Sequence, residues 1–222
     1  MEVIEGKITS YDERGQMTVA ARYDNTDRLI KRRYQTVLIG LQDGRKASPE
    51  QIRKAHALIG EIADWSGEMP EQIKRLTKLQ YIAKQQNELC SSLFSLGSCD
   101  ITVAKEYITY LTEFILDWDV PTKIPLYELC DDIQKYIYAC LKHKKCAVCG
   151  GRGELHHIDR IGMGNNRTDV CHEGMEAMSL CREHHGEIHN MGDRAFFAKY
   201  HFDGGVILDK ELCKVYKLRA KK

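Results

Sequence analysis

The chain has 222 residues, of which 43% are hydrophobic and 29% charged, and its formal net charge is +1. This length fits one large or two small domains with a packed core. Nine cysteines, an odd number, argue against a secreted disulfide framework. Charges interrupt the first 30 residues and no apolar run is long enough to span a membrane. We therefore expect no signal peptide, no membrane contact and a cytoplasmic location.

The first 142 residues change from strand-like to helix-like patterns. Alternating apolar residues predict strands over residues 3–8, 17–20 and 36–40, with turns near residues 12–15 and 43–44. Ser48 followed by Pro49 is typical of a helix start, and Gly67 of a helix end. Apolar stripes predict further helices over residues 71–84, 103–118 and 127–142. The sequence thus predicts an α+β protein with a small β region and a helical domain over residues 1–142.

Four residues with the chemistry of zinc ligands form two equally spaced pairs. Cys146 and Cys149 make the first pair, and Cys181 and His184 the second, each separated by two residues. Structural zinc is tetrahedral and commonly takes thiolate and imidazole ligands in such pairs. The pattern predicts a structural Zn²⁺ site, and ordinary reduced cysteines are the alternative.

Four histidines predict a second metal site with its own base. Residues 154–158 alternate like a strand, which would direct His156 and His157 to opposite sides. His185 and His189 are four residues apart and share one face if their segment is helical. One strand histidine and two helix histidines make three ligands and leave positions open for water and a phosphate oxygen. The other strand histidine can then take a proton near neutral pH.

Residues 144–203 resemble the HNH, or ββα-metal, endonucleases in the form that carries a zinc knuckle. The histidine pairing is especially similar to the DNase domains of colicins, and residues 156–164 and 180–189 resemble a group of phage HNH nucleases. The resemblance implies that His157 is the general base and that a catalytic divalent metal is bound by His156, His185 and His189. It implies Mg²⁺ or Mn²⁺ there, with Zn²⁺ or Ni²⁺ as alternatives, and a zinc-containing ββα-metal domain over residues 143–222.

One position departs from the family pattern. HNH proteins usually carry an asparagine that braces the loop next to the base, and the nearest equivalent here is Glu176. Asn165, Asn166 and His172 are the alternatives for that bracing role. The departure leaves a structural, DNA-binding module without turnover as the competing interpretation of the histidines.

Charge gives only weak support for a nucleic-acid partner. From Lys144 onward the chain has 14 Lys and Arg against 11 Asp and Glu, whereas dedicated DNA-binding domains are usually more basic. Several arginines lie near the predicted metal site in the sequence, and phosphate contacts would be useful there. We select Arg152, Arg160 and Arg182 as candidate substrate-binding residues, with an ordinary solvated surface as the alternative.

Residues 28–120 resemble, more loosely, the NinB recombination-mediator family of lambdoid phages. The similarity depends on a strand ending near Ile39, a helix through Gln51 and Ile59, and a Ser-led helix from Ser98 to Phe114. It implies single-stranded DNA binding and a homodimer, and we transfer no binding residues from it.

These patterns predict a divalent-metal-dependent DNA endonuclease that acts in phage DNA recombination or replication, in the cytoplasm of the bacterial host. Its DNA would be single-stranded or branched. The alternative is a non-catalytic recombination mediator or single-stranded-DNA-binding protein with a zinc-stabilised, degenerate HNH module. An RNA-processing nuclease is a weaker interpretation, because nothing in the sequence resembles an RNA-binding module.

Overall fold

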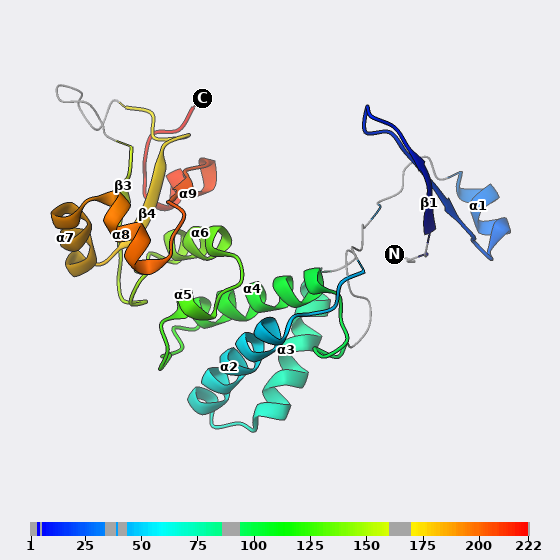
Figure 1. The fold of residues 1–222 in the computed structure, drawn as a ribbon, viewed down its shortest axis with the longest axis horizontal. Helices are drawn as coiled ribbons and strands as arrows, with labels where there is room; N and C mark the ends of the chain where they lie inside the picture. The colour runs from blue at the N-terminus through cyan, green and yellow to red at the C-terminus, as the bar shows by residue number, and fades with distance from the viewer. Residues whose placement is uncertain are drawn as a thin grey trace. The chain divides into compact units, whose positions relative to one another are not determined.

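The computed structural model describes residues 4, 6–33, 39, 44–85, 94–159 and 170–221. The backbone divides into two compact units, Met1–Leu41 with Asn87–Leu89, and Gln42–Gln86 with Cys90–Lys222. Helices combine with two small antiparallel sheets (Figure 1), which confirms the predicted α+β class. None of the described helices combines the length and the hydropathy that a membrane crossing requires.

The described residues of the first unit form a β-hairpin and one helix. Strand β1 (Gly6–Tyr11) pairs antiparallel with β2 (Met17–Ala21), and helix α1 spans Thr26–Arg32. The Asp12 carboxylate closes the hairpin turn by accepting hydrogen bonds from the backbone N–H groups of Arg14 and Gln16, both at 2.9 Å. The hairpin agrees with the first two predicted strands, although β1 extends three residues past its predicted end. The third predicted strand, residues 36–40, lies outside the described residues apart from residue 39.

The second unit begins with three helices, α2 (Pro49–Ser66), α3 (Pro70–Gln85) and α4 (Ile101–Asp117). The Ser48 side chain accepts from the N–H of Gln51, and the Gln51 side chain accepts from the N–H of Ser48. This reciprocal cap fixes the start of α2 where the sequence predicts it. The helices bury large apolar side chains between them, including Leu58, Tyr107 and Leu111.

The predicted fourth helix, residues 127–142, is wrong as a single element, because it is broken in two. Helix α5 spans Leu126–Leu129 and α6 spans Ile133–His143. Asp132 causes the break, because its carboxylate caps α6 by accepting from the N–H of Lys135 at 3.1 Å. Asp131 leaves the helical path as well, and its carboxylate accepts from the Gln51 side chain at 2.8 Å.

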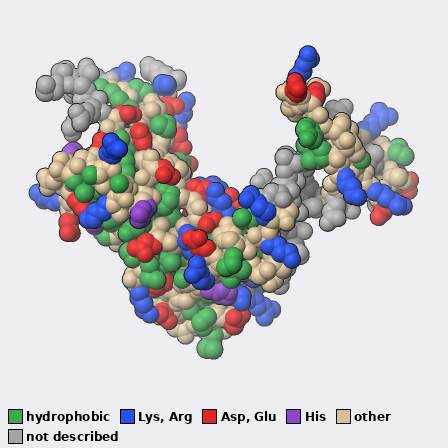
Figure 2. Space-filling model, viewed as in Figure 1, with side chains coloured by type: hydrophobic (Ala, Val, Ile, Leu, Met, Phe, Trp, Pro, Cys, Tyr) green, Lys and Arg blue, Asp and Glu red, His purple; other side chains and the backbone are tan. Residues whose placement is uncertain are grey.

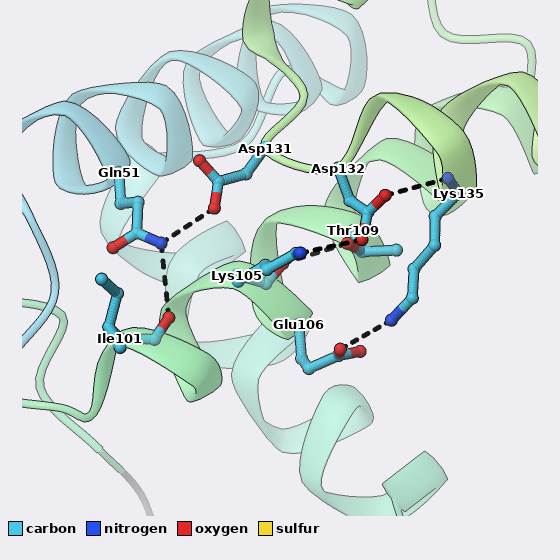
Figure 3. Close-up of polar contacts among 8 residues, drawn as sticks. All are labelled: Gln51, Ile101, Lys105, Glu106, Thr109, Asp131, Asp132 and Lys135. Atoms are coloured by element: carbon cyan, nitrogen blue, oxygen red, sulfur yellow. Dashed lines mark hydrogen bonds and ion pairs between the residues drawn. The ribbon is translucent and has the colours of Figure 1, made fainter. Parts of the chain in front are cut away.

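A polar network therefore links α2, α4 and the α5–α6 junction (Figure 3). Lys105 of α4 pairs with Asp132 at 3.0 Å, and Lys135 of α6 pairs with Glu106 of α4 at 2.6 Å. The Gln51 side chain also donates to the backbone oxygen of Ile101 at 3.3 Å. The polar side chains of this network pair with one another or with the backbone, so we assign them a structural role.

The remainder of the second unit contains a three-stranded antiparallel sheet in the order β3 (Glu154–His157), β4 (Glu176–Leu180) and β5 (Val206–Ile207). Helix α7 (Arg182–Met191) starts directly after β4, followed by α8 (Asp193–Tyr200) and, after β5, α9 (Lys210–Val215). For residues 204–222 the sequence leaves two alternatives, strands over residues 206–208 and 215–218 or a docking tail. In the structure, residues 206–207 form β5, and α9 carries the chain to Val215.

Helix α6 joins this sheet to the other helices. It contacts both α4 and β4, and the Tyr136 hydroxyl donates to the backbone oxygen of Ala147 at 2.8 Å. Met178, Ile188 and Phe196 fill the core beneath the sheet and are at most 1% exposed. The predicted domain boundary between residues 142 and 143 falls at the end of α6, within the second compact unit, and stays a prediction.

Candidate metal centre and base

The cysteine-rich cluster comes from a turn after α6 and from the start of α7. The turn containing Cys146 and Cys149 is closed by hydrogen bonds from Gly150 N–H to Cys146 O and from Cys146 N–H to Gly151 O. Gly150 has a φ of 69°, which favours glycine at this position. Cys181 is the N-cap residue of α7, and the helix then places His184 one turn later.

The four donor atoms of this cluster lie within 4.8 Å of one another. The sulfurs of Cys149 and Cys181 are 3.8 Å apart, and Nδ1 of His184 lies 3.1 Å from the Cys181 sulfur and 3.6 Å from the Cys146 sulfur. In a tetrahedron with Zn–S bonds of about 2.3 Å, two sulfurs lie about 3.8 Å apart. The donor set therefore fits one zinc ion in both chemistry and spacing.

The thiols of this cluster differ in acidity. Burial raises the pKa of Cys146 to about 12, despite hydrogen bonds from backbone N–H groups. Burial also acts to raise the pKa of Cys181, but hydrogen bonds from the backbone and side chain of His184 and from the thiols of Cys149 and Cys146 together lower this pKa to about 7. A bound cation deprotonates coordinating thiols, so binding at this cluster releases protons.

The second cluster joins β3 to α7. His156 projects from β3 against the two helix histidines, with ring centroids 4.8 Å from His185 and 5.1 Å from His189. The rings of His185 and His189 are 4.8 Å apart, as expected for residues one helical turn apart. The ligand atoms of all three histidines lie within 4.8 Å of one another. The structure thus brings together the three residues that the sequence selects as ligands of a catalytic metal.

The strongest sign that this cluster binds a cation is the environment of His156. The side chain is buried, with 4% of the residue exposed, and its Nε2 atom has no hydrogen-bond partner among the described residues. Burial, and then the charges of His185 and His189, lower the pKa of His156 to about 4. Burial also lowers the pKa of His185. Neutral imidazoles keep the lone pairs that a divalent cation needs, and a buried nitrogen without a partner is costly unless it finds one.

His157 lies apart from this cluster. Its Nε2 atom is 2.9 Å from Nδ1 of His172, and the two ring centroids are 4.9 Å apart. His157 thus contacts His172, whereas His156 contacts His185 and His189. These different neighbours agree with the prediction that the two strand histidines face opposite sides. From the sequence, His172 is only one of three alternatives for bracing the loop. In the structure its Nδ1 atom contacts the ring of His157.

Glu176, at the position where the family usually has asparagine, is engaged in two other contacts. Its carboxylate accepts from the N–H of Gly205 at 2.7 Å and so links β4 to the segment before β5. Its own N–H donates to the carboxylate of Asp159 at 2.7 Å, and its backbone oxygen accepts from the N–H of Ile158. Asp159, two residues after His157, therefore ties the chain just after β3 to the start of β4. Sequence reasoning missed this role, because the two bonded residues are 17 apart in the sequence.

The structure describes two of the three predicted substrate-binding arginines. Arg152 is exposed just after the cysteine turn, and Arg182 is exposed at the first position of α7. Arg160 lies outside the described residues. Figure 2 shows basic and acidic side chains interspersed on the visible face, so on that face contacts to a nucleic-acid backbone would depend on individual cations.

Comparison with known families gives one match. A family described as "Putative HNHc nuclease" matches residues 21–219, which is nearly the whole chain. No curated protein and no solved structure matches the chain. The match begins in the first compact unit and ends after α9, so it includes both histidine and cysteine clusters.

Proposed function

The chain belongs to this HNHc nuclease family, and from that premise we propose that it is a divalent-metal-dependent DNA endonuclease that hydrolyses phosphodiester bonds. The observation that carries the proposal is the cluster of three histidines, together with a fourth histidine, His157, which follows His156 on β3. His156 has a buried nitrogen without a hydrogen-bond partner, which a cation held with His185 and His189 would satisfy. His157 takes no part in that donor set, and we assign it the role of general base.

In the proposed reaction, His157 takes a proton from a water molecule as the water oxygen attacks phosphorus. A new phosphorus–oxygen bond forms, the bond to the 3′ oxygen breaks, and the departing oxygen takes a proton from solvent. A divalent cation bound to the three histidines supplies electrostatic stabilisation of the charge on the phosphate and on the departing oxygen. We propose Mg²⁺ or Mn²⁺ for this position, with Zn²⁺ or Ni²⁺ as alternatives.

The cysteine cluster would hold a structural zinc ion. Its ligands come from the turn after α6 and from the first turn of α7, the helix that also carries His185 and His189. A zinc ion bound there would fix the start of α7 relative to the sheet before substrate arrives. Such preorganisation keeps metal-binding side chains close to their productive positions.

We propose DNA as the substrate, with Arg152 and Arg182 contacting phosphates. Phosphodiester hydrolysis reads no base, so selectivity for single-stranded or branched DNA would come from other parts of the chain. Residues 1–142 are the proposed source, as a DNA-binding and dimerisation region. A role in phage DNA recombination or replication, in the cytoplasm of the bacterial host, is supported by the sequence resemblances described above.

The second candidate is a recombination mediator that binds DNA without cutting it. One observation favours it, namely that Glu176 stands where the family usually has asparagine. The hydrogen bond from Gly205 gives the Glu176 side chain a structural role. Asp159 supplies a brace for the loop in its place, so the substitution does not by itself remove catalytic machinery.

A nicking assay on supercoiled plasmid separates the two candidates. The full chain, purified with its zinc, is incubated with plasmid and with Mg²⁺ or Mn²⁺, and separately with no added divalent cation. Conversion to the open circular or linear form only when the cation is added supports the endonuclease. Binding of DNA in a gel-shift assay, with no cleavage under any cation, would establish the mediator instead.

A further inference from the structure

Among the described residues, neither His157 nor His172 belongs to a metal cluster, so their mutual contact is a feature separate from the two donor sets. We propose that His172 is a positioning residue for His157: its Nδ1 accepts a hydrogen bond from Nε2–H of His157 and thereby fixes both the orientation and the tautomer of that ring. This inference rests on the proposed function, in which His157 is the general base.

The chemistry of two imidazoles limits how this contact can be made. A neutral imidazole has one N–H donor and one nitrogen with a lone pair, so one of the two rings must donate. If His172 donated, the proton of His157 would sit on Nδ1, and no lone pair would be left for a proton from water. If His157 donates from Nε2, its lone pair is on Nδ1 and the ring can act as a base. The second arrangement is the one that the proposed reaction requires.

The backbone around His172 is held by the C-terminal part of the chain. Its N–H donates to the backbone oxygen of Arg219 at 2.9 Å, and the N–H of Lys221 donates to the carboxylate of Glu173 at 2.8 Å. Two residues on, Gly174 donates to the backbone oxygen of Leu208 at 2.8 Å. These bonds tie the segment before β4 to the residues on both sides of α9. They give the C-terminal residues a role that extends to the proposed base.

Burial makes this placement rigid. His172 is 4% exposed, so its ring cannot rotate without displacing neighbouring atoms. Partners that orient a metal-ligating imidazole and fix its tautomer typically contribute about 10–100-fold to activity, and we expect the same scale for a partner that orients a base. His172 would perform for His157 the orienting task that a carboxylate or backbone carbonyl performs for catalytic histidines elsewhere.

Two substitutions at one position test the proposal. His172→Leu removes the acceptor, and His172→Asn keeps a polar atom close to the position of Nδ1. We expect His172→Leu to lower kcat for plasmid nicking by roughly 10–100-fold, with KM for DNA and Mn²⁺ affinity unchanged. His172→Asn should recover most of that loss. His56→Asn, which changes an exposed histidine of α2, is the control for histidine substitution.

A double-mutant cycle shows whether the effect passes through His157. In a His157→Ala background, His172→Leu should have no further effect on kcat, because there is no base left to position. Equal fold-losses in both backgrounds, or a folded His172→Asn variant as slow as His172→Leu, would overturn the proposal.

A spectroscopic test requires no cleavage and no substitution. Ring nitrogen–proton correlation spectra of ¹⁵N-labelled, zinc-loaded protein should show His157 protonated at Nε2, with an added coupling to Nδ1 of His172. A neutral His157 protonated at Nδ1 would refute the arrangement, even if His172→Leu fails to fold. If the unmodified chain never nicks DNA, the proposed function fails, whereas this spectrum still decides the hydrogen bond.

Discussion

Separate substitution of His157 and His185 should distinguish a base from a metal ligand. His157 is not one of the three donors of the histidine cluster, so His157→Ala leaves all three donors in place. Loss of a general base typically costs 10²–10⁴-fold in rate, or roughly 3–5 kcal/mol of transition-state stabilisation. We expect that loss in kcat together with an unchanged affinity for Mn²⁺.

His185→Ala should behave differently, because it removes one of three donors. Loss of an outer partner of a ligand costs 10–100-fold in metal affinity, so loss of the ligand itself should cost more than about 100-fold. His185 is preferable to His156 for this test. The buried ring of His156 would leave a cavity, which would confuse lost metal binding with lost stability.

Both variants should remain folded. His157→Ala leaves Nδ1 of His172 without its ring partner, at a cost of about 1–3 kcal/mol, which is less than the usual total stability of a domain. Mn²⁺ affinity by titration calorimetry, nicking rate at saturating Mn²⁺, and circular dichroism decide the matter, with His56→Ala as the control. Loss of metal affinity in His157→Ala but not in a folded His156→Ala would mean that the two strand histidines exchange roles. Normal nicking by both His157→Ala and His185→Ala would place the active site elsewhere.

Three further predictions concern the zinc cluster and the sheet. Cys181→Ser should lower the zinc content of the purified protein from one ion per chain and reduce its melting temperature. Elemental analysis and calorimetry measure the two effects. Wild-type protein that is folded but contains no zinc would contradict the prediction. Removal of zinc by a strong chelator should open the exposed Cys149 thiol to alkylation, whereas Cys140, which is fully buried, should react only on unfolding. Mass spectrometry of the labelled peptides tests both. Gly205→Ala should lower the free energy of unfolding in urea by about 1–3 kcal/mol, because a Cβ there would lie 2.5 Å from a backbone oxygen of β4. The control is Gly186→Ala on α7, where a Cβ meets open space, and this variant should be neutral or stabilising.

The sequence predicts both metal clusters because their geometry is encoded locally. A spacing of two residues brings Cys146 and Cys149 together on one turn, and a spacing of four brings His185 and His189 onto one helical face. Two long-range relations have to be supplied, the placement of β3 and that of the cysteine turn next to α7. The family resemblance supplies both, and in each cluster the donor atoms lie within 4.8 Å of one another.

The broken fourth helix shows where periodicity misleads. Apolar positions continue at helical spacing through Leu129 and into Tyr136, so residues 127–142 look like one helix. The adjacent carboxylates of Asp131 and Asp132 have better partners outside the helical path, in Gln51 and in the N–H of Lys135. Aspartate competes with the backbone for hydrogen bonds in this way, and an apolar stripe contains no information about it. The short helix α9 is not predicted for a related reason, because six residues are too few to establish a period, and the shortness of β5 leaves residues 206–208 open between a strand and a docking tail.

The surroundings of the proposed base could not be predicted, because they depend on contacts between residues that are distant in sequence. A family pattern specifies an asparagine at one position, but what the loop needs is a hydrogen bond at one place in space. Here Asp159 supplies it from the loop to the backbone of Glu176, across 17 residues, and the Glu176 side chain holds Gly205 instead. His172 reaches His157 across 15 residues, and Arg219 fixes the backbone of His172 across a further 47. A substitution at a family's signature position is therefore weak evidence against activity until the hydrogen bond that the residue would make has been located in the fold.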